Sequence, residues 1–194
     1  MNTNAMAEGP YKANQEAVTK RLTEKYAIGR LVEHDVLGEP IIWAKDVDDA
    51  KLLVKTFMLD ENTKVDFLSD LTAYDNMDGE DGEGRFIMVY QMYSTILHTR
   101  IRIKARVSEN TQVPSITDTF PAANWLEREV FDLFGISFTG HPNLRRIMMD
   151  ERFSGHPLRK EYPIKQREPF RDNVRLHMGA NAKEVDTHVK EGGN

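Results

Sequence analysis

The sequence contains no cysteine. Disulfides, thiolate-bound zinc, Cys-ligated iron–sulfur clusters and cysteine nucleophiles are therefore excluded from this chain. The sequence also lacks any run of the roughly 18 apolar residues that a membrane-spanning helix needs. Its first stretch, MNTNAMAEGPYKANQ, has neither the basic start nor the apolar segment of a secretory signal. From these absences we expect a soluble or peripheral protein.

A surplus of positive charge is missing as well, because 26 Lys and Arg residues stand against 31 Asp and Glu residues and the net charge is -5. Nucleic-acid binding depends on an excess of Lys and Arg that neutralises phosphates. General binding of this kind is therefore not expected, and any basic function must be local.

One predicted strand, at residues 99–107, is such a local exception. Its apolar residues alternate with basic ones on the opposite face, namely Arg100, Arg102, Lys104 and Arg106. A nucleic-acid-binding domain that uses this strand remains an alternative function of another class. We favour a solvated or subunit-facing surface, because Asp66 and Asp70 on an earlier strand can form cross-strand ion pairs and no aromatic stacking residues accompany the basic face.

Hydrophobic periodicity predicts an α+β fold: a mixed or antiparallel sheet with helices packed on one face, followed by a long irregular C-terminal arm. Helical periods and helix-end signals indicate helices at 14–26, 48–59 and 121–134. Strands are indicated at 31–37, 41–44, 65–73, 86–93 and 99–107, and 86–93 is apolar on both sides and therefore central. The Gly- and acid-rich stretch 75–84 is expected to be a solvated hairpin loop.

Helix ends and buried faces follow from the same patterns. Asp48 or Asp49 is expected to cap the second helix, Asp118 or Thr119 the third, and Gly135 to end the third. The residues expected to be buried on the second helix are Leu52, Leu53, Phe57 and Leu59, and those on strand 65–73 are Val65, Phe67, Leu71 and Ala73. On the third helix the apolar stripe is Ala122, Ala123, Leu126, Val130, Leu133 and Phe134, with Trp125 and Phe131 to either side of it.

Residues 136–175 show no periodicity, yet bulky apolar residues keep recurring there among Pro, His and Arg. A long segment without elements is uncommon in a compact domain, and a disordered tail would contain few bulky apolar residues. We therefore expect an extended arm that buries these residues against another subunit. The predicted organisation is a flexible N-terminus at 1–12, an α+β domain at 13–135, a partner-binding arm at 136–175 and a flexible tail at 176–194.

The third predicted helix carries four charges in its middle: Glu127, Arg128, Glu129 and Asp132. At about 100° per residue these side chains point in several directions, so some of them must enter the protein or a partner, where a charge needs an opposite charge or hydrogen bonds. We expect cations of the arm to pair with the helix acids and so to organise the start of the arm. The candidate cations are Arg145, Arg146, Arg152, Arg159 and Lys160.

No residue pattern indicates catalysis. His141 and His156 each precede a proline, but two histidines without a third ligand at metal-binding spacing do not make a metal site. We expect each imidazole to shape a turn by donating to a backbone carbonyl. Nothing resembles a nucleophile elbow or a Ser/His/Asp signature. No catalytic, cofactor-binding or metal-binding residue is therefore expected in this chain.

The third helix and the arm together resemble a known family. The fixed spacing of Glu127-Arg128-Glu129, Asp132-Leu133-Phe134, His141, Arg145 and Ile147-Met148 is similar to the signature of the C-subunit family of respiratory complex I, also called the thirty-kilodalton subunit family. The flanking stretches 123–126, 140–142 and 155–163 agree with it, and 70–75 is similar to the family's strand before a long loop. The resemblance covers roughly residues 15–165.

This resemblance implies a non-catalytic scaffold subunit in the peripheral arm of proton-translocating NADH:quinone oxidoreductase. That enzyme passes electrons from NADH through FMN and iron–sulfur clusters, which would lie in partner subunits, to quinone. The implied partners are chiefly the quinone-site subunit, designated D, and the subunit with the terminal iron–sulfur cluster, designated B. The implied place is the cytoplasmic side of the bacterial inner membrane.

Two further expectations follow from the resemblance. A close alternative is the equivalent subunit of a membrane-bound hydrogenase or a ferredoxin-linked relative. Because the sequence ends soon after the arm, we expect a separate chain and not a fusion with the quinone-site subunit.

The signature and its flanks supply the residues expected at interfaces, with Leu144, Leu158, Tyr162 and Pro163 as anchors. Replacement of Glu129 by alanine is expected to weaken assembly. The whole set is Trp125, Glu127, Arg128, Glu129, Asp132, Phe134, Gly135, His141, Pro142, Leu144, Arg145, Arg146, His156, Pro157, Leu158, Arg159, Lys160, Tyr162 and Pro163.

Overall fold

The structure is a computed structural model that describes residues 10–27 and 29–163, so the predictions for residues 1–9, for the end of the arm and for the tail lie outside it. The helices and strands in order are α1 (Pro10–Tyr26), β1 (Val32–His34), β2 (Pro40–Trp43), α2 (Val47–Leu59), β3 (Phe67–Asp75), β4 (Phe86–Ser94), β5 (Thr99–Val107), β6 (Val113–Pro114), α3 (Ala123–Phe134) and β7 (Phe138–Thr139). None of the helices in the described part of the chain has the length and apolar character to cross a membrane.

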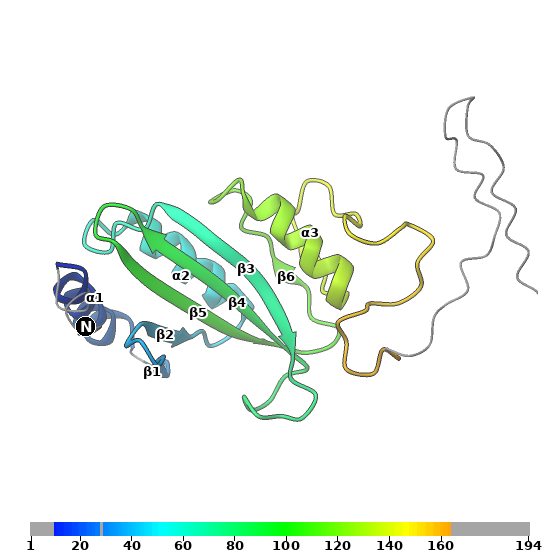
Figure 1. The fold of residues 1–194 in the computed structure, drawn as a ribbon, viewed down its shortest axis with the longest axis horizontal. Helices are drawn as coiled ribbons and strands as arrows, with labels where there is room; N and C mark the ends of the chain where they lie inside the picture. Colours follow the sequence, from blue (N-terminus) through cyan, green and yellow to red (C-terminus); the bar gives the residue numbers. More distant parts are fainter. Residues whose placement is uncertain (1–9, 28, 164–194) are drawn as a thin grey trace, which may run out of the picture. The chain divides into compact units, whose positions relative to one another are not determined.

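Five of the strands form one sheet in the order β1-β2-β5-β4-β3 (Figure 1). β2 and β5 are parallel, whereas the other neighbouring pairs are antiparallel, so the sheet is mixed. β6 and β7 form a separate two-stranded parallel pair. β4 is an interior strand as expected, but the middle strand is β5. The predicted fold class is confirmed.

The hydrophobic core lies on one face of the sheet, where the helices pack. Figure 1 shows α2 crossing behind the sheet and α3 lying along β3. The sheet contributes the alternate apolar residues of β4 and β5, which are Phe86, Met88, Tyr90, Met92, Ile101, Ile103, Ala105 and Val107. The helices contribute Val18, Leu22 and Tyr26 from α1, Leu53, Val54 and Phe57 from α2, and Ala123, Val130 and Phe134 from α3. The period-two and helical patterns therefore identified the core correctly for most elements.

A β-bulge changes which residues of β3 are buried. Leu68 lies opposite Met92 and Asp70 lies opposite Gln91, so the intervening Ser69 has no partner. Because side chains alternate between faces, one extra residue reverses the phase of the strand residues before it, whereas Val65, which precedes β3, is buried as predicted. Leu68 is accordingly buried, and the predicted burial of Phe67 is wrong, since its side chain is 52% exposed.

Two predictions about burial on the helices are also wrong. Leu52 and Leu59 of α2 are 58% and 66% exposed, although Leu53 and Phe57 are buried as expected. Ala122 is exposed because it precedes the first turn of α3 and does not face the sheet. The apolar stripe of α2 is narrower than the sequence suggested, since one row of buried residues suffices for a helix that covers a sheet from one side.

The N-cap of α2 is Asp46, and not Asp48 or Asp49 as predicted. The carboxylate of Asp46 accepts the backbone N–H of Asp49 at 2.7 Å. The carboxylate of Asp49 is used elsewhere, since it accepts Nε of Arg30 at 2.8 Å and the N–H of Lys45 at 3.0 Å. This ion pair ties the segment after α1 to the start of α2.

The prediction of a side-chain cap for α3 is wrong as well. Its N-cap is Ala122, which makes no side-chain cap hydrogen bond. A tight turn separates Asp118 from the helix, since the N–H groups of Thr119 and Phe120 both donate to the carbonyl of Ile116. Asp118 forms an ion pair with Lys51 instead, at 3.2 Å. Gly135, in contrast, ends α3 in the left-handed conformation as predicted.

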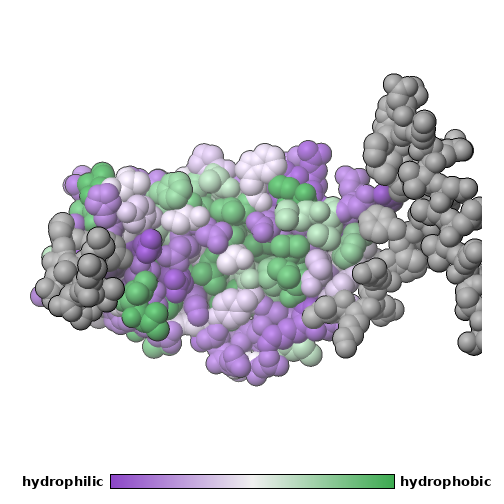
Figure 2. Space-filling model, in the orientation of Figure 1, coloured by the Kyte–Doolittle hydropathy of each residue, from purple (hydrophilic) through white to green (hydrophobic). Residues whose placement is uncertain are grey.

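The basic face of β5 is paired with acids, but these are not Asp66 and Asp70. β5 lies between β2 and β4, whereas Asp70 belongs to β3 and Asp66 directly precedes it, so neither is on a strand next to β5. The ion pairs of this face are Arg100 with Glu39 at 3.0 Å, Arg102 with Asp35 at 3.7 Å and Lys104 with Asp81 at 3.9 Å. Figure 2 shows hydrophilic and hydrophobic residues mixed over this face, with a strongly hydrophilic patch at the acidic loop.

An aromatic ring does accompany this basic face, contrary to expectation. Trp43 comes from β2, and its ring lies 4.9 Å from Nζ of Lys104 and 4.2 Å from the guanidinium carbon of Arg106. Because both cations cover the ring, Trp43 is buried. The indole is therefore occupied within the chain and does not offer a stacking platform for a base.

The cap assignment of α2 is testable with a matched pair of variants. Asp46→Ala is expected to lower the free energy of unfolding by about 1 kcal/mol, because it leaves an N–H of the first turn without an acceptor. Asp48→Ala, which removes an exposed acid two residues away, is expected to lower the free energy of unfolding by a few tenths of about 1 kcal/mol at most. Urea denaturation followed by circular dichroism measures both; an equal effect of the two substitutions would contradict the assignment.

Candidate functional site

The residues that carry the family resemblance gather where the arm passes the C-terminal half of α3. Figure 1 shows the arm, coloured yellow to orange, looping past the end of this helix. The candidate site is the contact between α3 and residues 140–163 of the same chain. Two fully buried acids, Glu127 and Asp132, lie on the helix side of this region.

Asp132 is the centre of this contact. Its carboxylate is fully buried, and one oxygen accepts three successive backbone N–H groups, those of Ile147, Met148 and Met149, at 2.9, 2.7 and 2.8 Å. The other oxygen pairs with Nη1 of Arg146 at 2.7 Å. Burial alone would raise the pKa of Asp132, but the three N–H groups and Arg146 together lower it below its ordinary value. The arm therefore forms an anion-binding nest around an ionised side chain.

Arg128, one turn earlier on the same face of α3, binds the preceding peptide groups of the arm. Its Nε donates to the carbonyl of Arg145 at 3.0 Å and its Nη2 to the carbonyl of Arg146 at 3.1 Å. The guanidinium also lies 5.0 Å from the centre of the Trp125 ring. A cation and an anion four residues apart on one helix thus hold the carbonyls and the amides of one short stretch of backbone.

The arm also closes the C-terminal end of α3. The last four carbonyls of a helix have no partner within it. Here that of Phe131 accepts the N–H of Gly135 at 2.9 Å, and that of Asp132 accepts Nδ1 of His156 at 2.9 Å. The carbonyl of Leu133 accepts the N–H of Leu158 at 3.1 Å and that of Phe134 accepts Nε of Arg159 at 2.7 Å. All four groups are therefore satisfied, three of them by the arm.

Gly135 is required by this packing as well as by its backbone. Its φ is +76°, and a Cβ there would lie 2.6 Å from the His156 ring and 2.9 Å from Nη2 of Arg159. Each of the two histidines has a ring nitrogen within hydrogen-bond distance of a backbone carbonyl, as the turn-shaping interpretation predicted. His156 donates through Nδ1 to a carbonyl, whereas Nδ1 of His141 accepts the N–H of Asn143 and its Nε2 faces the carbonyl of Asn124 at 3.1 Å.

Glu127 is the second fully buried acid of α3, and it faces away from the arm. One of its oxygens accepts the N–H of Ile116 at 2.7 Å, which holds the turn before α3. Its other oxygen has no hydrogen-bond partner among the described residues. Burial raises the pKa of Glu127 above its ordinary value, against the opposing effect of the Ile116 N–H. A buried carboxylate with one bare oxygen is a destabilising group when it is ionised.

Glu129 does not take part in this network. Its side chain is exposed, and it makes no hydrogen bond or ion pair within the described part of the chain. The expectation that all four helix charges organise the start of the arm therefore holds for Arg128 and Asp132 only. Glu129 and the neighbouring Trp125, which is 60% exposed, are available to another molecule.

The cations of the arm were expected to pair with the acids of the helix, and only Arg146 does so. Arg145 is exposed and contributes its carbonyl, and Arg152 pairs with Asp150 at 2.7 Å within the arm. Arg159 pairs with Glu109 at 2.7 Å and Lys160 with Asp78. Pairing depends on which residues meet in space, and the backbone amides took the place of the expected cations at Asp132.

The remaining predicted interface residues divide into packed and exposed ones. Phe134 is buried against Phe86, Leu144 packs against the core, and Tyr162 lies on Phe153 at 5.8 Å. Pro157 is half-buried. Pro142, Leu158 and Pro163 are exposed. Met148, which is part of the signature but not of the predicted interface set, is also exposed, at 61%. The view that this stretch is too irregular to fold on its own chain is wrong for residues 136–163, whereas its role in binding partners stays a prediction.

Sequence reasoning missed three kinds of participant. It missed the amides of residues 147–149, which act through the backbone and carry no side-chain signal. It missed Glu109, whose turn meets the arm only in the folded chain. It also missed Asp75, which accepts the N–H of Lys160 at 2.7 Å. The acid-rich composition of residues 75–84 was visible, but nothing local showed what those acids face.

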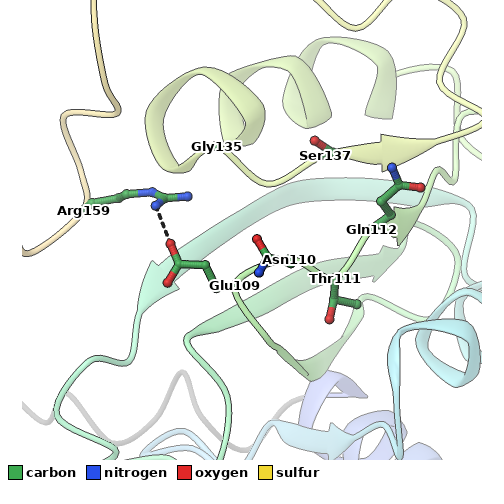
Figure 3. Close-up of a pocket in the computed structure, with 7 residues that line it drawn as sticks. All are labelled: Glu109, Asn110, Thr111, Gln112, Gly135, Ser137 and Arg159. Carbon is green, nitrogen blue, oxygen red and sulfur yellow. Dashed lines mark hydrogen bonds and ion pairs between the residues drawn. The ribbon is translucent and has the colours of Figure 1, made fainter.

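A polar pocket of about 340 Å³ lies beside this contact, between the turn after β5 and the end of α3 (Figure 3). Glu109 and Arg159 point toward each other across it and form the ion pair noted above. Its other lining residues are neutral: Asn110, Thr111, Gln112, Gly135 and Ser137. Within the described ranges, no group of three or more His, Asp or Glu side chains gathers in a way that could hold a metal.

Comparison with known proteins connects this arrangement to one family. The model of the family "Respiratory-chain NADH dehydrogenase, 30 Kd subunit" matches residues 45–168. The C subunit of NADH-quinone oxidoreductase from Trichlorobacter lovleyi is 41% identical over 165 residues, which cover 84% of this chain and 99% of that protein. The same subunit of Rhodopseudomonas palustris is 46% identical over 120 residues, which cover 61% of this chain and 59% of that protein. The chain thus spans about three fifths of that second relative.

A solved structure shares the fold. A chain of the membrane-bound sulfane sulfur reductase, described as an archaeal respiratory membrane complex, superimposes with a TM-score of 0.61. The two chains are 23% identical, and the match covers 77% of this chain and 86% of the other. At this identity the likeness shows a common fold.

The buried state of Glu127 leads to a pH-dependent prediction. When folding raises the pKa of a carboxyl group, the free energy of unfolding is not reduced at a pH below the unfolded-state pKa, because the group is then protonated in both states. The free energy of unfolding falls as the pH rises through the folded-state pKa, because the buried group must then ionise. Glu127→Gln keeps the acceptor for Ile116 without the charge. The variant is therefore expected to be at least as stable as the unchanged protein at pH 8, with the difference shrinking toward pH 5. Thermal unfolding across this range measures it.

Glu129→Gln is the matched control for that experiment, since it removes one exposed charge from the same helix. It is expected to leave the pH dependence of the melting temperature unchanged. A Glu127→Gln variant clearly less stable than the unchanged protein at pH 8 would show that the carboxylate makes a favourable interaction instead.

Proposed function

The chain belongs to the family of the 30 kDa subunit of respiratory-chain NADH dehydrogenase, and from this premise we propose that it is a scaffold subunit of an NADH:quinone oxidoreductase. In this role it holds neighbouring subunits in place and performs no chemistry of its own. Its proposed location is the peripheral part of the complex, on the cytoplasmic side of the inner membrane.

The observation that carries this proposal is the use made of the charges in α3. Asp132 and Arg128 are buried and bind the backbone of the arm, and Glu127 binds the turn before the helix. Apart from one buried oxygen of Glu127, the hydrogen-bonding groups named here are directed at structure, and none of the three side chains is exposed to a substrate. Such a network supports a shape that other subunits recognise, which is what a scaffold must supply.

The electron route is proposed on the same premise. FMN and the iron–sulfur clusters are assigned to partner subunits, and electrons pass from NADH through them to quinone, coupled to proton translocation. The lack of cysteine supports this division, because thiolates are the usual ligands of such clusters. This chain would position the cluster-bearing subunits at electron-transfer distance.

The proposed partners are the D and B subunits of the same enzyme, bound by the exposed apolar residues around the arm. Trp125, Met148 and Leu158 are 60%, 61% and 51% exposed, and they flank the rigid contact between the arm and α3. Tryptophan and methionine are enriched at the centres of protein interfaces, where they fill pockets on the partner. Because hydrogen bonds within the chain hold the backbone of Met148 and Leu158, little ordering of the backbone is needed when a partner binds.

Two alternatives predict different behaviour. The equivalent subunit of a complex with another electron donor would have the same fold and the same scaffold role, but the complex isolated with it would not oxidise NADH. A nucleic-acid-binding role is disfavoured by the ion pairs that occupy Arg100, Arg102 and Lys104. It predicts salt-sensitive retention of the isolated chain on heparin.

The scaffold proposal is tested at Asp132. In Asp132→Asn one oxygen can still accept the three amides, but the new NH2 group faces Nη1 of Arg146, so donor meets donor. We expect a loss of about 2 kcal/mol in stability of the arm contact and a several-fold lower amount of assembled complex in membranes of the native host. Native gels measure the amount, and NADH:quinone activity per assembled complex is expected to stay unchanged.

Glu151→Gln is the control, because Glu151 is an exposed acid of the same arm that makes no hydrogen bond or ion pair among the described residues. It is expected to assemble normally. If Asp132→Asn assembled normally and lost quinone reduction, the scaffold assignment would be wrong.

A further inference from the structure

The acidic loop, residues 75–84 between β3 and β4, has a defined structure in spite of its composition. Asn76 is buried at its centre. The side-chain amide nitrogen of Asn76 donates to the carbonyls of Gly82 and Gly84 at 2.9 and 3.1 Å, and its oxygen accepts the N–H of Asp81 at 3.1 Å. One side chain thus satisfies three backbone groups of the loop. The loop is therefore more than the solvated hairpin connection expected from its glycines and acids.

One side of the acidic loop is fastened to the sheet. The carboxylate of Asp81 accepts the hydroxyl of Tyr74, and its backbone carbonyl accepts Nε of Arg106 at 2.7 Å. Nζ of Lys104 donates to the same hydroxyl at 3.0 Å. Burial, and then the hydrogen bond to Asp81, raise the pKa of Tyr74, so the phenol remains a donor. These contacts hold the loop in place independently of the arm.

The other side of the acidic loop holds the arm where the described chain ends. The carboxylate of Asp75 accepts the N–H of Lys160 at 2.7 Å and Nη2 of Arg85 at 2.9 Å. Asp78 forms an ion pair with the Lys160 ammonium, and Arg85 forms one with Glu161. Residues 160 and 161 are therefore gripped by groups of the β3–β4 hairpin, about 80 positions earlier in the sequence.

This grip differs in exposure from the attachment at Asp132. There the carboxylate is fully buried and Arg146 is 17% exposed. In the outer part of the grip, the side chains of Lys160, Asp78 and Glu161 are 43%, 62% and 48% exposed, whereas its inner pair, Asp75 and Arg85, is only 2% and 17% exposed. Exposed ion pairs are weak and are screened by salt, since the Debye length falls from about 10 Å at 0.1 M to about 3 Å at 1 M. Salt reaches the outer ion pairs of the grip, which support the inner bond between Asp75 and the Lys160 amide, but it does not reach the Asp132 nest.

We propose that the acidic loop is a releasable clasp for the end of the arm. When the clasp is closed, Lys160 and Glu161 are bound to the β3–β4 hairpin. When it opens, residues 160–163 detach from the hairpin, while residues 146–149 stay bound to Asp132 and residues 156–159 still cap α3. The contact between the arm and α3 is kept when the clasp opens, so the two attachments have separate roles.

Amide hydrogen exchange of the full chain, resolved to single residues, tests the clasp. Raising NaCl from 0.05 to 0.5 M is expected to speed exchange of the Lys160 amide by about two- to fivefold, the factor that corresponds to losing an exposed ion pair. The amide of Met148, bound to Asp132, is expected to keep its rate. Asp78→Asn at low salt should reproduce the effect of salt at Lys160, and again spare Met148.

Glu83→Gln is the matched control, because it removes one negative charge from the same loop at an exposed residue without a hydrogen bond or ion pair in the described structure. It is expected to leave both amides unchanged. The proposal is overturned if the Lys160 amide responds to neither salt nor Asp78→Asn. It is equally overturned if Met148 is accelerated together with Lys160, because the arm would then open as one unit. The salt series on the unchanged chain decides the matter even if a variant fails to fold.

Discussion

The structure depends on how one helix end is closed inside the protein. The last turn of α3 leaves carbonyl groups that need donors, and in the same turn Asp132 brings a negative charge into the interior. The arm meets both requirements, since residues 146–149 supply the donors for Asp132 and residues 156–159 supply those for the helix end. An irregular segment is thereby held in one conformation, because releasing it would leave a buried anion and several carbonyls without partners.

This constraint explains how a segment with neither helix nor long strand keeps a defined surface. Arg128 and Asp132 take successive carbonyls and amides of the same stretch, so the backbone of the arm is bonded much as it would be in a sheet. Some of its side chains are left to face outward, among them Met148 and Leu158, and Trp125 of the helix is exposed as well. In a family whose members are named as subunits of a larger enzyme, a rigid surface of this kind fits a role in assembly.

The elements were predictable where the information is local. Alternation in β5 indicated its buried face, the apolar character of β4 on both sides indicated its interior place in the sheet, and Gly135 marked the end of α3. Errors arose where a single residue changes the phase, as at the bulge of Ser69, or where several acids stand near one helix start, as Asp46, Asp48 and Asp49 do. They also arose where strand order was needed, since Arg100 and Lys104 meet acids from loops that no local pattern connects to β5.

The sequence by itself determined the composition limits, the α+β class, most of the core and the family resemblance, because each depends on residue types and spacings along the chain. It also showed that the charges of α3 could not all be solvated. Only the tertiary structure decided which of them are buried and what they bind, since the partners of Asp132 are backbone amides and those of the arm's end lie on a distant hairpin. Backbone groups are identical at every residue, so their pairing is set by where the folded chain places them.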